Sequence, residues 1–203
     1  LLFNEFKKGL KSYPLLGSKA LDIGAGNGQF VELLSELGLD AVGLEHNKEF
    51  VSEAVKKGLV IKQGYLLDNA ILKDKFDLIT CNNFLEHQPS INRFLNKVHA
   101  LMADNGLLYL SVPNLQRIVN EACFYEFVAD HLVYFSKKTL KKALDISGFE
   151  LLQIYFKNNK NDIVAVAKKR RPLNVQNKQK KMNSIINSLK VLVKKLHAKN
   201  KRI

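Results

Sequence analysis

One segment, "KALDIGAGNGQFVELLSELG", constrains the fold of this chain more than any other. An apolar run ends at Ile23, glycines follow at Gly24, Gly26 and Gly28, and a helical stripe begins at Gln29. Glycine is needed where the backbone adopts positive φ, or where a ligand comes so close that a Cβ would not fit. The segment therefore predicts a strand, a tight turn and a helix. Two interpretations are open: the turn binds a ligand, or it is a tight turn without a ligand.

The chain up to residue 168 alternates between strand-like and helical patterns of apolar residues. Such alternation is typical of βαβ units around a mainly parallel sheet. We expect strands near 19–24, 41–45, 60–63, 76–82, 106–112, 149–157 and 162–168, and helices over 4–11, 29–37, 48–57, 91–103 and 137–147. The last two strands flank "NNKN", which favours an antiparallel hairpin at the sheet edge. The prediction is a Rossmann-like α/β fold: seven mostly parallel strands, the last antiparallel, with helices on both faces.

Charge divides the chain into a domain and a tail. Residues 1–167 carry 19 basic and 19 acidic side chains, whereas 168–203 carry 13 basic side chains and no acidic one. The net charge of +13 therefore belongs to the tail. Because 203 residues suffice for one α/β domain with a core, we predict a single domain over 1–168 and a basic tail over 169–203.

An aromatic insertion, residues 114–135, follows the fifth predicted strand. Insertions at the carboxyl ends of strands commonly build the substrate side of a cleft in α/β proteins. Phe124, Tyr125 and Tyr134 are therefore candidate substrate-binding residues. Ordinary packing within a lid is the alternative.

The glycine spacing and a downstream acid indicate the kind of ligand. A dinucleotide fingerprint, G-x-G-x-x-G, has its third glycine at the sixth position, but here that position is Gln29. Glu45 ends the next predicted strand, where a carboxylate can accept hydrogen bonds from two ribose hydroxyls. The pattern favours an adenosine-type ligand without a pyrophosphate.

"LDIGAGNGQF" followed by "GLEHN" resembles the first two motifs of the class I S-adenosylmethionine-dependent methyltransferases. "FDLITCNNFLEH" and "GLLYLSVPN" are similar to later motifs, so the resemblance covers about residues 19–167. It implies S-adenosylmethionine as cofactor and S-adenosylhomocysteine as product. It also implies that Asp22 faces the methionine amino group, although a turn cap is its alternative role. Glu45 would hold the ribose, with a solvated strand end as the alternative.

The same resemblance implies a set of cofactor-binding residues. Tyr65 and Leu66 would border the adenine, and Asn82 and Asn83 would line the reactive end. The full predicted set is Asp22, Gly24, Ala25, Gly26, Gly28, Glu45, His46, Tyr65, Leu66, Asn82 and Asn83.

"DHLVYFSKKTLKKALDISGFE" resembles a subgroup of this family in which a histidine, a nearby phenylalanine and a helix ending in Gly-Phe close the acceptor pocket. Members of that subgroup often methylate sugars, glycan precursors and other small metabolites. Three roles stay open for His131: structural hydrogen bonding, orientation or deprotonation of the acceptor, and metal binding. His87 is a second candidate base, with a helix entrance as its alternative role. We predict no metal site, because no pair of carboxylates or histidines stands at ligand spacing around His131.

From Met182 onward the apolar residues of the tail recur with helical period, which predicts an amphipathic helix over 181–197. Three contacts remain open for it: an anionic membrane surface, RNA phosphates, or this domain or a second subunit of a homodimer. RNA is the least favoured, because the tail has no aromatic residue to stack on bases.

The predicted function is in-line methyl transfer to an oxygen of a small molecule or a surface-glycan precursor. An RNA-directed methyltransferase and a non-catalytic cofactor-binding scaffold are the alternatives. Cys81 and Cys123 have no metal-type spacing, and no apolar run approaches the roughly 18 to 20 residues of a membrane span. We therefore expect a cytoplasmic monomer or homodimer that the tail can attach to the inner face of a membrane.

Overall fold

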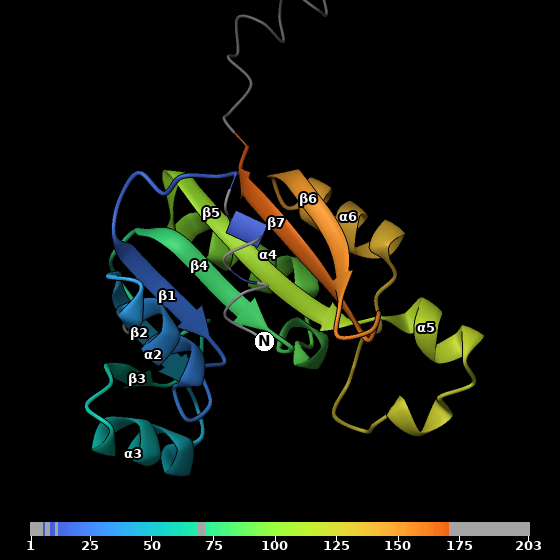
Figure 1. Ribbon diagram of the computed structural model, residues 1–203, viewed down its shortest axis with the longest axis horizontal. Helices are drawn as coiled ribbons and strands as arrows, with labels where there is room; N and C mark the ends of the chain where they lie inside the picture. Colours follow the sequence, from blue (N-terminus) through green and yellow to red (C-terminus); the bar gives the residue numbers. More distant parts are fainter. Residues whose placement is uncertain (1–5, 7–8, 11, 69–71, 171–203) are drawn as a thin grey trace, which may run out of the picture. The chain divides into compact units, whose positions relative to one another are not determined.

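The computed structural model describes residues 6, 9–10, 12–68 and 72–170. Seven strands form one sheet in the order β3-β2-β1-β4-β5-β7-β6 (Figure 1). The strands are β1 Lys19–Ile23, β2 Asp40–Glu45, β3 Ile61–Gln63, β4 Phe76–Asn82, β5 Met102–Pro113, β6 Phe149–Lys157 and β7 Asp162–Lys169. The pairs among β1 to β5 are parallel, and β7 runs antiparallel to both β5 and β6. The predicted sheet and its antiparallel hairpin are confirmed.

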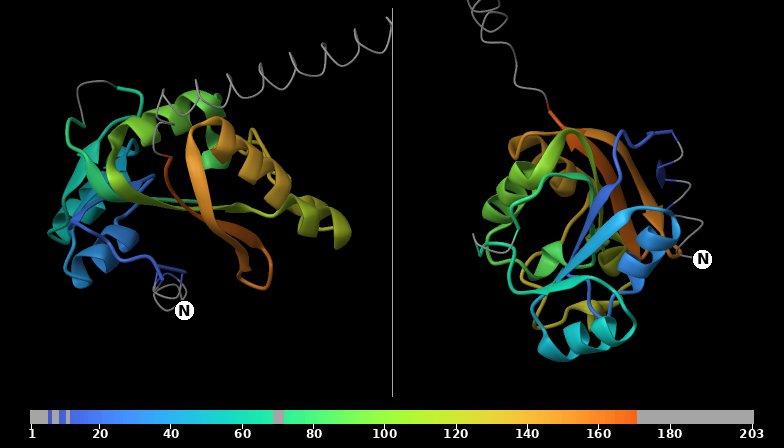
Figure 2. Two further views of the ribbon diagram at one scale, coloured as in Figure 1. Left: turned by 90° about the horizontal axis from the view of Figure 1, so that it is seen from above. Right: turned by 90° about the vertical axis from the view of Figure 1, so that its left-hand side faces the viewer.

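Helices cover both faces of the sheet (Figure 2). They are α2 Gln29–Glu36, α3 Lys48–Lys56, α4 Ile91–Leu101, α5 Leu115–Asn120 and α6 Lys137–Ile146, with short 3₁₀ turns η1 Leu85–His87 and η2 Phe124–Glu126. The apolar stripe of α2 packs with Phe6 and Tyr109 in one buried core. The stripes of α4 and α6 pack in a second core, which contains Ile79 and Leu110. Alternate side chains of β4 and β5 therefore enter opposite cores, as strand geometry requires.

Side chains at the helix starts explain two element boundaries. Asn47 Oδ1 accepts the backbone N–H groups of Glu49 and Phe50 at 2.8 and 3.2 Å, and so caps α3. Ser136 and Thr139 exchange side-chain and backbone hydrogen bonds in a capping box that starts α6. Both helices follow segments that reach the candidate site, so their caps fix where those segments end.

One predicted boundary is wrong. α4 ends at Leu101 rather than at residue 103, and β5 begins at Met102 rather than at 106. Met102 pairs with Phe76 across a register shift in β4. A Cβ on Gly106 would lie 2.8 Å from the Phe76 carbonyl oxygen, so the glycine permits this close approach. Tertiary pairing extends the strand into a segment whose local pattern is helical.

Two other predictions concern the ends of the chain. Phe6, Gly9 and Leu10 are helical, consistent with the expected helix over 4–11, whose other residues lie outside the described ranges. The predicted amphipathic helix over 181–197 also lies outside them. Within the described ranges, no helix has both the length and the hydropathy needed to cross a membrane.

Candidate functional site

The glycine turn after β1 adopts left-handed backbone conformations. Gly24 has φ 74°, and a Cβ there would lie 2.3 Å from the ring of Phe84. Gly26 has φ 53°, and a Cβ there would have no atom within 4 Å. Gly24 is therefore required by packing and Gly26 by backbone conformation, with free space in front of it.

Glu45 connects this turn to β2. Its side chain is buried, and its two carboxylate oxygens accept the backbone N–H groups of Gly26 and Asn47 at 2.9 and 2.8 Å. Nδ1 of His46 lies 3.1 Å from the same carboxylate. Because each carboxylate oxygen can accept more than one hydrogen bond, both retain capacity toward a ligand. The turn and the acid act as one preorganised unit.

A cavity of about 830 Å³ opens where β1, β2 and β4 end. Its walls are Gly24, Gly26, Glu45, His46, Asn47, Phe50, Tyr65, Leu66, Leu67, Asn83, Phe84, His87, Gln88, Pro89 and Asp130. Eight of the residues predicted from sequence are among them: Gly24, Gly26, Glu45, His46, Tyr65, Leu66, Asn83 and His87. The cavity is large enough for a nucleoside-sized ligand.

An aromatic wall borders the cavity at the end of β3. The rings of His46 and Tyr65 stack with centroids 5.1 Å apart and planes inclined by 22°. Leu66 is buried beside them, whereas Tyr65 is 61% exposed. This wall presents an exposed ring face and an apolar side chain, the surface on which a planar base can rest.

Asp22 lies beneath the turn and does not line the cavity. Its carboxylate is buried and accepts a hydrogen bond from Thr80 Oγ1 at 2.6 Å. Burial raises the pKa of Asp22 to about 7; the Thr80 hydrogen bond opposes this and the Glu45 charge adds to it. Ala25 and Gly28 are also absent from the walls, and a Cβ on Gly28 would lie 2.5 Å from Leu59, so that glycine serves helix packing.

A buried polar network stands behind the end of β4. Ser111 Oγ contacts the side-chain oxygens of Asn82 and Asn83 at 3.2 and 3.3 Å, and Lys157 Nζ lies 3.1 Å from that hydroxyl. Asn83 has φ 45° and lines the cavity, while Asn82 does not. Sequence reasoning identified both asparagines but missed Ser111 and Lys157. Their only signal was a serine and a lysine near strand ends, which is common on any sheet.

On the other side of the cavity the structure brings His87 and His131 together. Their ring centroids are 4.7 Å apart, and Nδ1 of His87 lies 2.9 Å from the carbonyl oxygen of Asp130. Burial lowers the pKa of His131, and the nearby His87 lowers it further while Asp130 opposes both. His87 lines the cavity, whereas His131 does not line it and packs against the His87 ring.

Glu86 completes this cluster, and sequence reasoning did not assign it a role. It is 1% exposed, and one ligand atom each of Glu86, His87 and His131 lie within 4.8 Å of one another. The sequence shows no metal-ligand spacing around His131, but the fold brings these three side chains close together. The signal in the sequence was the Glu-His pair directly after a strand.

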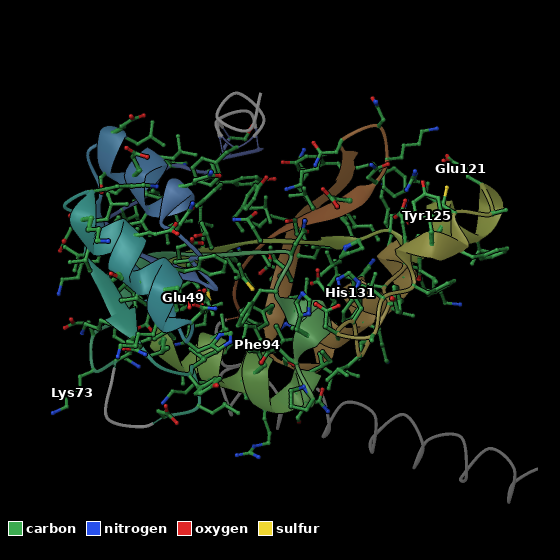
Figure 3. All side chains as sticks on the ribbon, turned by 90° about the horizontal axis from the view of Figure 1, so that it is seen from below. Glu49, Lys73, Phe94, Glu121, Tyr125 and His131 are labelled. Atoms are coloured by element: carbon green, nitrogen blue, oxygen red, sulfur yellow. The ribbon has the colours of Figure 1, made fainter. Side chains whose placement is uncertain are left out.

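The aromatic insertion contributes less to the cavity than predicted. Phe124 and Tyr125 are 60% and 77% exposed and do not line the cavity. Tyr134 packs near His131 with centroids 5.5 Å apart, and its hydroxyl accepts the Val128 N–H at 2.9 Å. Figure 3 shows Tyr125 close to Glu121, far from Glu49 of α3, with His131 between these ends of the molecule. Of the predicted substrate residues, Tyr134 is the one beside the histidines.

Comparison with known proteins agrees with this geometry. The profile of a family described as a methyltransferase domain matches residues 4–154. The chain is 31% identical over 115 residues to a ubiquinone biosynthesis O-methyltransferase of Haemophilus ducreyi, covering 51% of this chain and 49% of that protein. It is 24% identical over 144 residues to the C-methyltransferase NovU of Streptomyces niveus, covering 68% of this chain and 34% of that protein. The chain therefore spans about half the length of the first relative and about a third of the second.

Solved structures share the fold. A SAM-dependent methyltransferase from Archaeoglobus fulgidus matches with a TM-score of 0.69 at 19% identity, over 83% of this chain and 93% of that one. Magnesium protoporphyrin IX methyltransferase from Synechocystis PCC 6803 matches with a TM-score of 0.66 at 18% identity, over 83% and 82%. The family profile covers most of the sequence, so this chain belongs to the methyltransferase domain family, and its fold is that of S-adenosylmethionine-dependent methyltransferases of known structure.

Proposed function

We propose that this domain transfers the methyl group of S-adenosylmethionine to an oxygen of a small molecule, of the class of sugars and surface-glycan precursors. One observation carries the proposal: Gly26, Glu45 and His87 line a single cavity. The predicted cofactor side and the predicted acceptor side are therefore continuous. In-line displacement needs this continuity, because its rate depends mainly on alignment of the two reactants.

The residues around the glycine turn fit an adenosyl ligand. Gly26 faces open space where any other residue would place a side chain, so a ligand can approach the backbone. Glu45 is held in place by two backbone N–H groups and can accept ribose hydroxyls. Tyr65 and Leu66 supply a surface for the base. When bound, S-adenosylmethionine supplies a methyl group that its sulfonium has already activated.

On the acceptor side, His131 is the group to which we assign orientation of the acceptor hydroxyl and removal of its proton. Imidazole titrates in the range where such a base works, and partial burial lowers the pKa of His131, which favours the neutral form. His87 lines the cavity, contacts the His131 ring and can hold the acceptor. The name of the Haemophilus ducreyi relative supports an oxygen acceptor, while NovU is named for methyl transfer to carbon.

Incubation with methyl-labelled S-adenosylmethionine and fractionated metabolites and envelope material tests the proposal. We expect the label in a small molecule or glycan precursor. The labelled methyl group should be released under conditions that cleave an O-methyl ether. Binding of S-adenosylhomocysteine, measured by isothermal titration, is the independent check on the cofactor. A chain that binds neither cofactor nor product would refute the proposal, and label attached to carbon would refute the oxygen assignment.

A further inference from the structure

Two buried polar groups of the acceptor side lack hydrogen-bond partners. Neither carboxylate oxygen of Glu86 is paired with any described residue, and neither is Nδ1 of His131. Such groups destabilise a folded protein unless they are paired in its working state. A carboxylate oxygen and a ring nitrogen of these two residues lie within 4.8 Å of each other. An unpaired carboxylate thus lies close to the imidazole ring that carries the unpaired Nδ1.

The main chain holds the two side chains close together. The backbone carbonyl of Glu86 accepts the N–H groups of Leu132 and Val133 at 2.9 and 3.1 Å. The His87 ring is in turn bound to the carbonyl oxygen of Asp130 at 2.9 Å. Hydrogen bonds therefore join the segment around Glu86 to the segment around His131, more than forty positions later in the sequence. The gap between the two groups is longer than a hydrogen bond, but hydrogen bonds in unliganded sites are often long before substrate binds.

We infer that Glu86 positions His131 by accepting a hydrogen bond from Nδ1–H, which leaves Nε2 unprotonated and directed at the acceptor hydroxyl. A buried carboxylate plays this orienting part for a catalytic histidine in other enzymes. The inference rests on the proposed function and deepens it, because it names the group that fixes the tautomer of the base. Glu86 acts through His131 and is a positioning residue.

The charges around Glu86 are consistent with this role. Burial raises the pKa of Glu86 to about 7; its own backbone and His87 oppose the rise, while Asp162 and Asp130 add to it. Cys81 is also close, and burial raises the pKa of its thiol well above the usual value, so it stays neutral. Asp130 opposes the lowering of the His131 pKa, but its carboxylate is mostly exposed and lies 3.5 Å from Nδ1 of His87. Burial therefore favours the neutral form of both Glu86 and His131.

The tautomer of His131 can be read without knowing the acceptor. In ¹⁵N-labelled full-length protein, we expect the His131 resonances to report the Nδ1–H form. Glu86→Leu should shift them toward the Nε2–H form, whereas Glu121→Leu, a control at a half-exposed carboxylate outside the cavity, should leave the tautomer unchanged. An unchanged tautomer in Glu86→Leu would overturn the inference. If that variant does not fold, Glu86→Gln gives the same comparison through a changed pH dependence of the His131 resonances.

Kinetics with the labelled acceptor form the second arm. Glu86→Gln should lower kcat by about 100-fold and flatten the pH profile near 7, while KM stays the same. Binding of S-adenosylhomocysteine should be equal in all variants, so loss of cofactor binding by the unmodified protein counts against the proposed function and not against Glu86. Stoichiometric Zn²⁺ binding that disappears in Glu86→Gln would instead show that Glu86, His87 and His131 form a metal site, and would overturn the inference.

Discussion

At the scale of single residues, a substitution at Gly26 allows the stability cost of backbone strain to be measured separately from the loss of ligand binding. Gly26→Ala places a methyl group in free space, so its stability cost is that of a non-glycine residue at positive φ, about 1 kcal/mol. Gly38 has φ 81° and equally free surroundings, but it lies outside the cavity. We expect Gly26→Ala and Gly38→Ala to lower the unfolding free energy equally in urea denaturation.

Only Gly26→Ala should weaken S-adenosylhomocysteine binding in isothermal titration, because its methyl group occupies ligand space. Equal affinities of the two variants would show that the turn does not contact the cofactor. Gly24→Ala should be far more damaging than either, since its Cβ would meet the Phe84 ring.

We expect Asp22, which lies beneath the glycine turn, to make cofactor binding depend on pH. With its pKa raised to about 7 by burial, the carboxyl of the free protein is protonated in mildly acidic solution. A methionine ammonium group favours the ionised carboxylate, so binding releases a proton. The affinity for S-adenosylhomocysteine should therefore rise about tenfold between about pH 6 and about pH 7.5.

Titration in buffers of different ionisation enthalpy measures that proton directly. Asp22→Asn should bind more weakly and with no proton release. A proton release that persists in Asp22→Asn would assign the effect to another group.

The site residues that were predicted from sequence have signals that lie close together along the chain. The residues that were missed do not. Gly26 and Glu45 belong to adjacent turns whose spacing is visible along the chain, and the structure joins them by one hydrogen bond. Glu86 becomes important only because His131 folds back against it. No local pattern distinguishes a buried carboxylate from a solvated helix entrance. Lys157 was unpredictable for the same reason, since lysines are rarely buried.

At the scale of elements, the β6–β7 hairpin depends on a buried charge pair. Lys157 and Asp162 are 5% and 7% exposed, and their charged groups lie 4.0 Å apart. Lys157→Met should destabilise the protein by about 3–5 kcal/mol, because it removes one member of a buried ion pair and leaves the Asp162 carboxylate buried. Urea denaturation measures this loss.

The double variant Lys157→Met/Asp162→Asn should recover part of that stability, since no buried charge remains. The matched control is Lys168→Met on the same hairpin. Its partner is Glu150, both side chains are about half exposed, and the expected cost is about 0–1 kcal/mol. Equal losses for the two single variants would contradict the argument.

Element boundaries were predictable where local signals agree with tertiary pairing. The helix beginning at Lys48 was placed correctly because Asn47 is a strong cap and its pattern has no competitor. The end of α4 was placed too late because Met102 pairs with Phe76, a contact 26 residues away in sequence that no local pattern reveals.

At the scale of the whole molecule, strand order locates the site before any side chain is considered. The chain crosses from β3 at one edge back to β4, on the other side of β1. Parallel sheets bind ligands at such a switch in order, beyond the carboxyl ends of the strands. Gly24 follows β1, Asn83 follows β4, and both line the cavity. The strand order therefore locates the cleft. The alternating pattern predicts this class of fold, but the chemistry of the acceptor side depends on contacts between residues that are distant in sequence.

The basic tail gives the last prediction, and it concerns partners rather than catalysis. Residues 168–203 hold 13 basic and no acidic side chains, and the apolar stripe from Met182 to Leu196 predicts an amphipathic helix. We propose that the tail binds an anionic membrane surface, where each basic residue contributes about 1 kcal/mol. Replacing Lys190, Lys194 and Lys195 by Gln in the full chain should then weaken binding to phosphatidylglycerol vesicles by about 100-fold, while binding of S-adenosylhomocysteine is unchanged. Vesicle sedimentation at low and high salt measures this; affinity equal for phosphatidylcholine vesicles, or insensitive to salt, would exclude the membrane assignment.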